Sequence, residues 1–374
     1  MNIVTYAQVL HDLNVIKDEG HKEVILGLRD YSRFGKLNKT DYLSFSKRAR
    51  ELGLRVIFEW DILMCENDFA TLAHELPELL IHADVLRVQD PGALEWGIKN
   101  STLPLQFIAE NGNHNLIALK GWCDHANGRM DRIVLSIELP KTIIEEYIKT
   151  LNVPCELLGF GRILLFYTPR KLLAPLVEDK YSYHEYIEAL GESEESPHKG
   201  FPLVENKHGT FMFHIKDFCV LDYAKDLADY GLHSLRIDLR WSDFSLIKDI
   251  WNVESLKEKH PQDLMKGFYL VNKTDVLFPK LKNSRLQKRE GNYIGEVIEA
   301  EKSSHLAIFV KNPKGLKKND LLKFIHPKGD EIEAQIYSLK NLALEEVDYI
   351  PPHTTGIIQF VGGVWVKSHV FYRD

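Results

Sequence analysis

Eight short β-branched runs alternate with amphipathic helical patterns along the chain up to about residue 240, and this alternation constrains the fold more than any other feature. Helical patterns such as Asp41–Leu52 and Pro140–Leu151 begin at Asp or Pro, which are residues that start helices. Alternating β and α units predict a parallel sheet, and eight of them predict a closed (β/α)8 TIM-like barrel, class α/β. We expect the strands at Asn2–Tyr6, Glu23–Leu28, Arg55–Trp60, Val85–Gln89, Leu105–Ala109, Arg132–Ile137, Glu156–Phe160 and Ser234–Leu239.

An open doubly wound sheet is the alternative fold. It should carry a glycine-rich phosphate fingerprint after the first strand, and the stretch TYAQVL has none.

A long insertion at about residues 163–233 separates the seventh and eighth units. Insertions of this length in a barrel are usually binding loops or lids, and a disordered segment without a function is the alternative. We expect an exposed polar loop at Glu188–Lys199, a hairpin at Phe201–His214 and a helix at Asp217–Tyr230.

The pattern changes after Arg240. Residues 241–259 are expected to be helical, so the barrel domain is predicted to span residues 1–260 and a basic linker residues 261–290. Six short strands separated by turn signals such as NPKG then predict a small C-terminal β-barrel domain over residues 291–374.

The composition is that of a water-soluble protein with a sizeable core, since 44% of its 374 residues are hydrophobic and 27% are charged. A net charge of −7 argues against a general nucleic-acid coat. Four cysteines lie far apart without a CxxC pair, as in reduced cytoplasmic proteins. Neither a signal peptide nor a membrane-spanning run is recognisable, so we expect a cytoplasmic protein with no membrane partner.

Polar side chains follow almost every predicted strand, and the active site of such a barrel lies at those ends. Carboxylates facing several arginines would suit an anionic or peptide-like ligand, although any barrel rim is polar and a solvated edge is the bland alternative. As substrate-binding candidates we take Arg29, Glu59, Asp90, Asn111, Arg162, Asp238 and Arg240, and as catalytic candidates Glu110, Glu138 and His114.

The densest polar cluster is ENGNHN, which contains Glu110 and His114. This pair could supply a general base and a donor, or two metal ligands, while a turn with a helix cap explains the cluster equally well. A third ligand could come from Cys123, Asp124 or His125 by residue type alone. We therefore assign no metal-binding residue and no cofactor, and leave a divalent metal open.

The cysteines do not resemble a cluster-binding set, because iron–sulfur clusters generally need four thiolates that are often close in sequence. Cys155 is expected on a core strand, and Cys123 and Cys219 on helices, as small buried hydrophobes. Only Cys65 falls in a loop where a catalytic thiol could lie, and nothing nearby marks it as activated.

The order of several segments resembles that of the peptidase U32 family, the collagenase-like peptidases. The resemblance covers nearly the whole chain, and the tail is similar to that family's C-terminal β-barrel extension in GFYLVNK, YIGEVIEA and GLKKNDLLKFIHPKG. The barrel segments that carry it are VILGLRDYSR, LRVIFEWDIL, ADVLRVQDPG, LPLQFIAENGNHN, MDRIVLSIELP, CELLGFGRILLFYTPRK, FPLVENKHGTFMFHIKD and GLHSLRIDLRW.

The resemblance implies a barrel with one of two broad activities. Some members are proteases acting on collagen-like or other proteins, and others hydroxylate RNA bases or a quinone precursor without oxygen, using cysteine-bound iron–sulfur clusters. This chain has Phe160-Gly161 where the family usually has His-Gly, and Arg170-Lys171 where it has Arg-Cys, which disfavours a cluster. Family positions that are retained are Glu138, Glu156, Gly161, Arg162, Arg236, Asp238 and Arg240.

The leading expectation is a cytoplasmic peptidase acting on proteins or peptides, with Glu110 and Glu138 in acid–base roles and Arg162 and Arg240 holding an anionic group. One alternative is a protein that modifies RNA or a quinone precursor, or a cluster-free partner of a paralogous protein. The other is a non-catalytic binding protein on a degenerate barrel.

Overall fold

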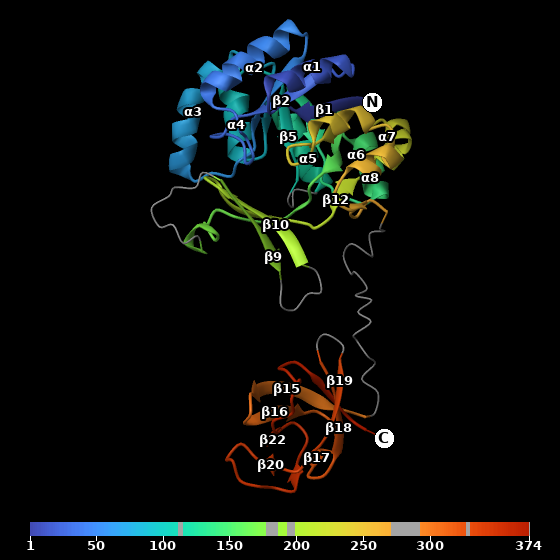
Figure 1. Ribbon diagram of the computed structural model, residues 1–374. Coiled ribbons are helices and arrows are strands. Elements are labelled where there is room, and N and C mark those ends of the chain that lie inside the picture. The colour runs from blue at the N-terminus through green and yellow to red at the C-terminus, as the bar shows by residue number, and fades with distance from the viewer. Residues whose placement is uncertain (111–114, 177–185, 193–198, 271–291, 327–329, 374) are drawn as a thin grey trace. The chain divides into compact units, whose positions relative to one another are not determined.

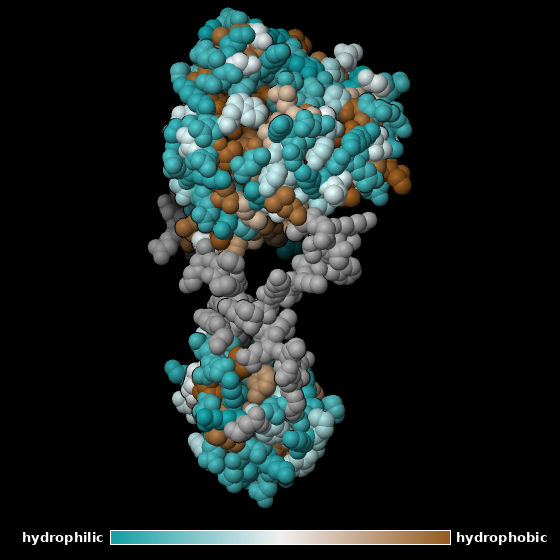
Figure 2. Space-filling view, turned by 90° about the vertical axis from the view of Figure 1, so that its right-hand side faces the viewer, coloured by the Kyte–Doolittle hydropathy of each residue, from teal (hydrophilic) through white to brown (hydrophobic). Residues whose placement is uncertain are grey.

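The structure is a computed structural model that describes residues 1–110, 115–176, 186–192, 199–270, 292–326 and 330–373. The described residues form two compact units, one up to residue 270 and the other from residue 292. No helix of the described residues is long and apolar enough to cross a membrane. On the face that Figure 2 shows, hydrophilic residues cover most of each unit and apolar residues are scattered in small patches.

The first unit is a closed parallel barrel (Figure 1). Neighbouring strands pair in parallel in sequence order, and the eighth strand pairs with both the first and the seventh, which closes the cylinder. The predicted barrel is confirmed, and the open doubly wound alternative is wrong. The strands are β1 (Asn2–Tyr6), β2 (Glu23–Gly27), β3 (Arg55–Trp60), β4 (Val85–Val88), β5 (Leu105–Ile108), β6 (Met130–Val134), β7 (Cys155–Gly161) and β13 (Ser234–Ile237).

The helices cover the outside of this barrel because each buries one apolar stripe. In α2, for example, Tyr42, Phe45 and Ala49 recur at helical spacing and pack into the main hydrophobic core, while Asp41, Lys47 and Arg50 are exposed. The helices are α1 (Leu10–Asp18), α2 (Lys39–Glu51), α3 (Glu66–Leu80), α4 (Pro91–Asn100), α5 (Leu116–His125), α6 (Lys141–Thr150), α7 (Ala224–Asp229) and α8 (Val253–Lys259), with 3-10 turns at Ala174–Leu176, Leu221–Tyr223 and Phe244–Asp249.

The insertion after β7 builds an antiparallel four-stranded sheet at one end of the barrel (Figure 1). The predicted hairpin is present as β10 (Lys199–Asn206) and β11 (Gly209–Phe213), flanked by β8 (Leu164–Thr168) and β9 (Tyr186–Glu192). The expected loop at Glu188–Lys199 is wrong over its first residues, because β9 pairs with β10 as an edge strand. Edge strands tolerate the charged residues that made this stretch resemble a loop.

The helix expected at Asp217–Tyr230 begins later than predicted. Its first residues form β12 (Asp217–Cys219), which pairs with β7 on one side and with β14 (Leu264–Met265) on the other, and α7 follows. Cys219 therefore ends a strand and does not lie on a helix. Hydrogen bonds to the exposed end of β7 compete successfully with the local helical pattern.

The second unit is an antiparallel half-barrel sheet over its own hydrophobic core. All six predicted strands are present, and within the described residues the two edge strands of the sheet are not paired with each other. The strands are β15 (Tyr293–Glu301), β16 (His305–Val310), β18 (Leu321–Ile325), β19 (Glu331–Gln335), β20 (Leu339–Lys340), β22 (Thr355–Gln359) and β23 (His369–Tyr372), with β17 (Leu316–Lys317) and β21 (Tyr349–Ile350) forming a separate pair.

A buried ion-pair network fills the barrel interior. Glu156 on β7 accepts hydrogen bonds from both Nη atoms of Arg87, at 2.9 and 2.6 Å, and from Nη1 of Arg132 at 3.0 Å. Arg132 also donates to Glu23 at 2.7 Å. Burial opposes ionisation of Glu156, but the guanidinium groups of Arg87 and Arg132 lower its pKa to about 2. The network therefore stays charged, and it joins β2, β4, β6 and β7 through the centre of the barrel.

We predict that Glu156→Gln lowers the free energy of unfolding by about 3–5 kcal/mol, because it leaves two buried guanidinium groups short of a counter-charge. Since the pKa of Glu156 is lower in the folded than in the unfolded chain, its carboxylate stabilises the fold at neutral pH and loses that effect as acid protonates it. Urea unfolding should therefore show a smaller loss of stability between about pH 5 and pH 3 for the variant than for the wild type.

Glu78→Gln is the matched control, because Glu78 is exposed and pairs only with Lys39 at the surface. Its effect should stay within about 0.5 kcal/mol. Equal losses for the two variants would contradict the role assigned to the network.

Candidate functional site

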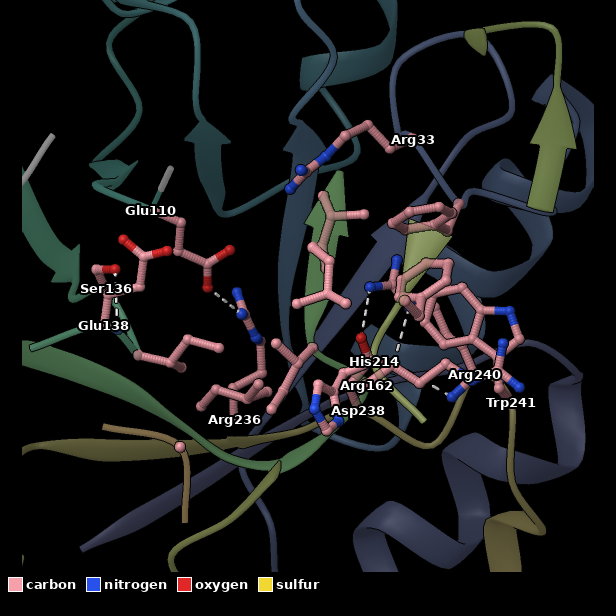
Figure 3. Close-up of a pocket in the computed structure, with 18 of the residues that line it drawn as sticks. Arg33, Glu110, Ser136, Glu138, Arg162, His214, Arg236, Asp238, Arg240 and Trp241 are labelled. Atoms are coloured by element: carbon pink, nitrogen blue, oxygen red, sulfur yellow. Dashed lines mark hydrogen bonds and ion pairs between the residues drawn. The ribbon is translucent and has the colours of Figure 1, made fainter. Parts of the chain in front are cut away.

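A cavity of about 300 Å³ opens at the carboxyl ends of the barrel strands, and Figure 3 shows how its side chains converge. In that view Glu110, Ser136 and Glu138 lie on the left, and Arg240 and Trp241 lie on the right. Arg33 lies at the top of the view. The lining residues are Tyr6, Arg33, Phe34, Asp61, Glu110, Ser136, Ile137, Glu138, Leu158, Arg162, Ile163, Leu164, Leu165, Phe213, His214, Arg236, Asp238, Arg240, Trp241, Met265, Gly267 and Phe268.

The first side of the cavity combines two carboxylates with a buried cation. Glu110, two residues beyond β5, forms an ion pair with Nη2 of Arg236 from β13. The Nε atom of Arg236 is buried and has no hydrogen-bond partner among the described residues. Glu138 lies in the turn after β6, with its backbone N–H donating to Ser136 Oγ at 3.2 Å, and its side chain is exposed at the rim. Glu110 and Glu138 thus face the same space from neighbouring strands.

The opposite side is organised around Arg240, whose side chain is only 8% exposed. Its Nε and Nη2 atoms donate to the two oxygens of Asp238 at 2.9 and 2.6 Å, and its guanidinium carbon lies 3.6 Å from the centroid of the Tyr6 ring. Burial alone would raise the pKa of Asp238, but Arg240 holds it below its usual value. Asp238 is therefore an ionised anchor for Arg240.

Below these residues lies Glu59, which is completely buried. Tyr6 donates to one of its oxygens at 2.7 Å and Ser32 to the other at 2.7 Å, while Arg240 Nη1 lies 3.8 Å away. Burial and the nearby Asp61 raise the pKa of Glu59. Glu59 therefore supports the floor of the site, and it is not among the residues that line the cavity.

Asp61 has the opposite tendency because Arg33 clamps it. The backbone N–H of Arg33 donates to one Asp61 oxygen at 2.7 Å, and Nε donates to the other at 2.9 Å. Although burial raises the pKa of Asp61, the Arg33 charge and these hydrogen bonds lower it overall. This pair fixes the loop between β2 and α2 against β3.

An aromatic wall carries the last cation of the site. The guanidinium of Arg162 lies 5.5 Å from the Phe213 ring centroid and 5.0 Å from that of Trp241. Phe34 packs against both rings, at 5.5 and 4.8 Å between centroids. Among the described residues Arg162 has no hydrogen bond or ion pair, so its charge is available to a ligand, and aromatic faces hold it in place.

His214 brings an imidazole from the insertion into the same cavity. Its Nδ1 accepts a hydrogen bond of 2.9 Å from the backbone N–H of Lys216. The carbonyl oxygen of Lys216 lies farther from Nδ1, at 3.2 Å, and a backbone N–H can only donate, so the shorter contact favours a neutral ring with its proton on Nε2. This nitrogen can donate a hydrogen bond to a ligand.

The turn after β7 places Arg162 because of Gly161. Its φ of +150° lies outside the range that other residues adopt readily, and an added Cβ would lie 2.9 Å from Cβ of Asp238. Only glycine therefore lets β7 pass this close to β13 and turn Arg162 towards the aromatic wall.

The structure brings together Glu110, Glu138, Arg162, Asp238 and Arg240 from the predicted set. It does not bring Arg29 or Asp90 to this cavity: Asp90 caps α4 by accepting the N–H groups of Gly92 and Ala93, and Arg29 lies near a second cavity. Asn111 and His114 lie outside the described residues.

Sequence reasoning missed Tyr6, Arg33, Phe34, Phe213, His214 and Trp241 as members of the site. The two Phe residues and Trp241 resemble ordinary core residues, and Arg33 lies six residues past the end of β2. His214 gave the strongest available signal, because it closes the predicted hairpin next to the barrel mouth.

None of the four cysteines lines the cavity. Cys155 and Cys219 are buried, and burial raises the pKa of the Cys155 thiol to about 12. Burial likewise raises the pKa of Cys123 to about 11. The exposed Cys65 donates to Asp68 at 3.0 Å at the start of α3. In the part of the chain that the structure describes, no group of three or more His, Cys, Asp or Glu residues is placed to hold a metal ion.

Comparison with known proteins gives a match to the model of Peptidase family U32 over residues 8–256. No sequence among the curated proteins matches the chain. Many solved structures are similar to parts or all of it, and three of them illustrate the range. The U32 peptidase Mk0906 is 13% identical with a TM-score of 0.34, over 43% of this chain and 70% of that one.

The other two cover the chain differently. The C-terminal domain of a Geobacillus thermoleovorans protein assigned to the same family is 12% identical with a TM-score of 0.21, over 22% of this chain and 93% of that one. An uncharacterised B. cereus protein is 10% identical with a TM-score of 0.36, over 98% of both chains.

We predict that Gly161→Ala destabilises the barrel by about 1–3 kcal/mol, because it imposes a strained backbone and pushes against Asp238. Thermal unfolding should show this loss, and tryptophan fluorescence should report displacement of the wall around Trp241. Gly121→Ala on α5 is the control, since nothing lies within 4 Å of its added Cβ. It should be neutral or stabilising by up to about 1 kcal/mol. A Gly161 variant as stable as the control would contradict the packing argument.

Proposed function

This chain belongs to peptidase family U32, and from that premise we propose that it hydrolyses peptide bonds in short peptides bound by an anionic group. The observation that carries the proposal is the convergence on one cavity of Glu110, Glu138 and Arg162, the last without an ion pair among the described residues. The volume of about 300 Å³ lies at the small end of the usual range for ligand sites, which favours a peptide end over a folded protein as substrate.

Arg162 is the residue proposed to bind the substrate's carboxylate. Its guanidinium is half-buried, rests on Phe213 and Trp241, and has no counter-charge among the described residues. A planar guanidinium suits a carboxylate because two parallel hydrogen bonds fix its orientation.

Glu138 is proposed as the general base. It would take a proton from a water molecule whose oxygen then forms a bond to the carbonyl carbon of the substrate. Glu110 forms an ion pair with Arg236 and is assigned a different role. Its part is to hold the Arg236 guanidinium beside the oxyanion that develops as the carbonyl is attacked.

His214 completes the proposed reaction. As the C–N bond breaks, Glu138 gives the departing nitrogen the proton that it took from water, and the Nε2–H of His214 assists by donating a hydrogen bond to the substrate. Water is thereby added across the peptide bond, and no oxidant or reductant is consumed.

We further propose that the protein works without a cysteine-bound iron–sulfur cluster. Thiolates are the ligands of such clusters, and here burial raises the pKa values of three of the four thiols, while none of the four lines the cavity. No described contact favours RNA or a paralogous protein as partner, and those remain predictions from the resemblance.

We expect Glu138→Gln to lower kcat by about 10²–10⁴-fold with little change in KM, because it removes the base and keeps the shape. Arg162→Ala should instead raise KM by about tenfold or more through loss of a charge-assisted contact. A library of short peptides with free C-terminal carboxylates, followed by mass spectrometry, provides the assay. The same peptides in amidated form should lose the dependence on Arg162.

Glu146→Gln on α6 is the control, since Glu146 is exposed and outside the cavity. The proposal fails if the combined Glu110→Gln, Glu138→Gln and Arg162→Ala variant cleaves a verified substrate as fast as the wild type.

For the cluster, we expect protein purified anaerobically from iron-supplied cells to be colourless, with iron well below one atom per chain. Iron and acid-labile sulfide analysis with an absorption spectrum provides the measurement. A brown protein with stoichiometric iron and sulfide would contradict the expectation and would favour the hydroxylation alternative.

A further inference from the structure

A second cavity of about 540 Å³ lies beside the first and shares Phe34, Arg240 and Trp241 with it. Neither the family description nor the hydrolysis proposed above gives it a role. It is lined by Arg29, Asp30, Ser32, Phe34, Gly35, Lys36, Asn38, Lys39, Tyr186, Asn206, Lys207, His208, Arg240 and Trp241.

The wall of this second cavity carries an excess of positive charge. Its five cationic side chains are Arg29, Lys36, Lys39, Lys207 and Arg240, and its one carboxylate is Asp30. Lys207 pairs with Asp30, and the other recorded counter-charges, among them Glu78 beside Lys39 and Asp238 beside Arg240, lie outside the wall.

The ammonium group of Lys36 has no hydrogen bond or ion pair among the described residues. Partial burial and the neighbouring Arg240 lower its pKa, with only Glu188 acting in the opposite direction. Lys36 and Arg240 repel each other at this cavity, and an anionic ligand would reduce that repulsion.

Arg240 places a second fixed charge at this cavity. Its side chain is 92% buried, its Nε and Nη2 atoms donate to Asp238, and among the described residues Nη1 has no hydrogen bond, with a Glu59 oxygen 3.8 Å away. The guanidinium is therefore held in place and adds its charge to that of Lys36 in the wall that both residues line.

The N-terminus of α2 faces the same cavity. Asn38 caps the helix by accepting the N–H of Asp41 at 2.8 Å, and the N–H groups of Lys39 and Thr40 have no intrahelical acceptor. Gly35 allows the preceding loop to approach β2 closely, because any Cβ there would overlap with the carbonyl of Leu28. The loop thereby brings Lys36 and the helix N-terminus to one place.

We propose that this second cavity binds a phosphate group between Lys36, Arg240 and the N-terminus of α2. Phosphate suits the site better than a carboxylate, because its extra charge and additional acceptor oxygens can serve two cations and a helix N-terminus together. Phe34 and Trp241, shared with the first cavity, lie where an organic group attached to the phosphate would continue.

Isothermal titration of the full chain with inorganic phosphate tests the proposal. We expect saturable binding that Lys36→Gln weakens by about tenfold and Lys36→Glu abolishes, as for loss and reversal of a charge-assisted contact. Lys47→Gln on the same helix is the control, because Lys47 is exposed and lines neither cavity. It should bind phosphate like the wild type.

Two further probes sharpen the result. Acetate should bind more weakly than phosphate, and phenyl phosphate should bind at least as tightly. Tighter binding of phenyl phosphate identifies a phosphate carried on an organic molecule, while equal binding identifies free phosphate, and both support the site. Absence of saturable phosphate binding, equal binding by the Lys36→Gln variant and the wild type, or acetate binding as tight as phosphate would each overturn the proposal.

Discussion

The arrangement of both cavities depends on the buried guanidinium of Arg240. A charge with 8% of its side chain exposed is stable only if counter-charges and dipoles surround it, and here Asp238, Glu59 and the ring of Tyr6 do so. Glu59 and Tyr6 lie on β3 and β1, and Asp238 directly follows β13, so satisfying one cation fixes three strands at the barrel mouth. Closure of the barrel through β13 is what makes this possible, since that strand pairs with both neighbours.

The charges at this mouth differ in what they can do because their surroundings differ. Asp61 and Asp238 are held ionised by Arg33 and Arg240, and Glu59 has a raised pKa beneath them. Paired groups of this kind build the frame. Arg162 and Glu138 differ from them, because one rests on aromatic rings and the other projects at the rim. Chemistry is therefore best assigned to these groups that face the cavity.

The barrel could be predicted from the sequence because the alternation of strands and helices leaves few topologies open. The same logic located part of the site, since side chains at the carboxyl ends of parallel strands must meet. It could not separate Asp90 from Asp238: both follow strands, yet one caps a helix and the other binds Arg240. The aromatic wall was beyond prediction, because Phe34 and Phe213 come from distant segments and look like core residues. β9 was not predicted either, because a strand at the edge of a sheet can contain polar residues.

Phe160, the residue before Gly161, shows one way in which this chain differs from the usual pattern of the family. Where that pattern leads us to expect His, Phe160 is fully buried, and its ring packs edge-to-face on His260 at 5.0 Å between centroids. Phe160 does not line the cavity, so β7 contributes no imidazole to the mouth. His214 reaches the cavity instead from the insertion that follows β7. A hydrogen-bond donor at the mouth can thus come from the insertion, while the barrel supplies the carboxylates and guanidinium groups.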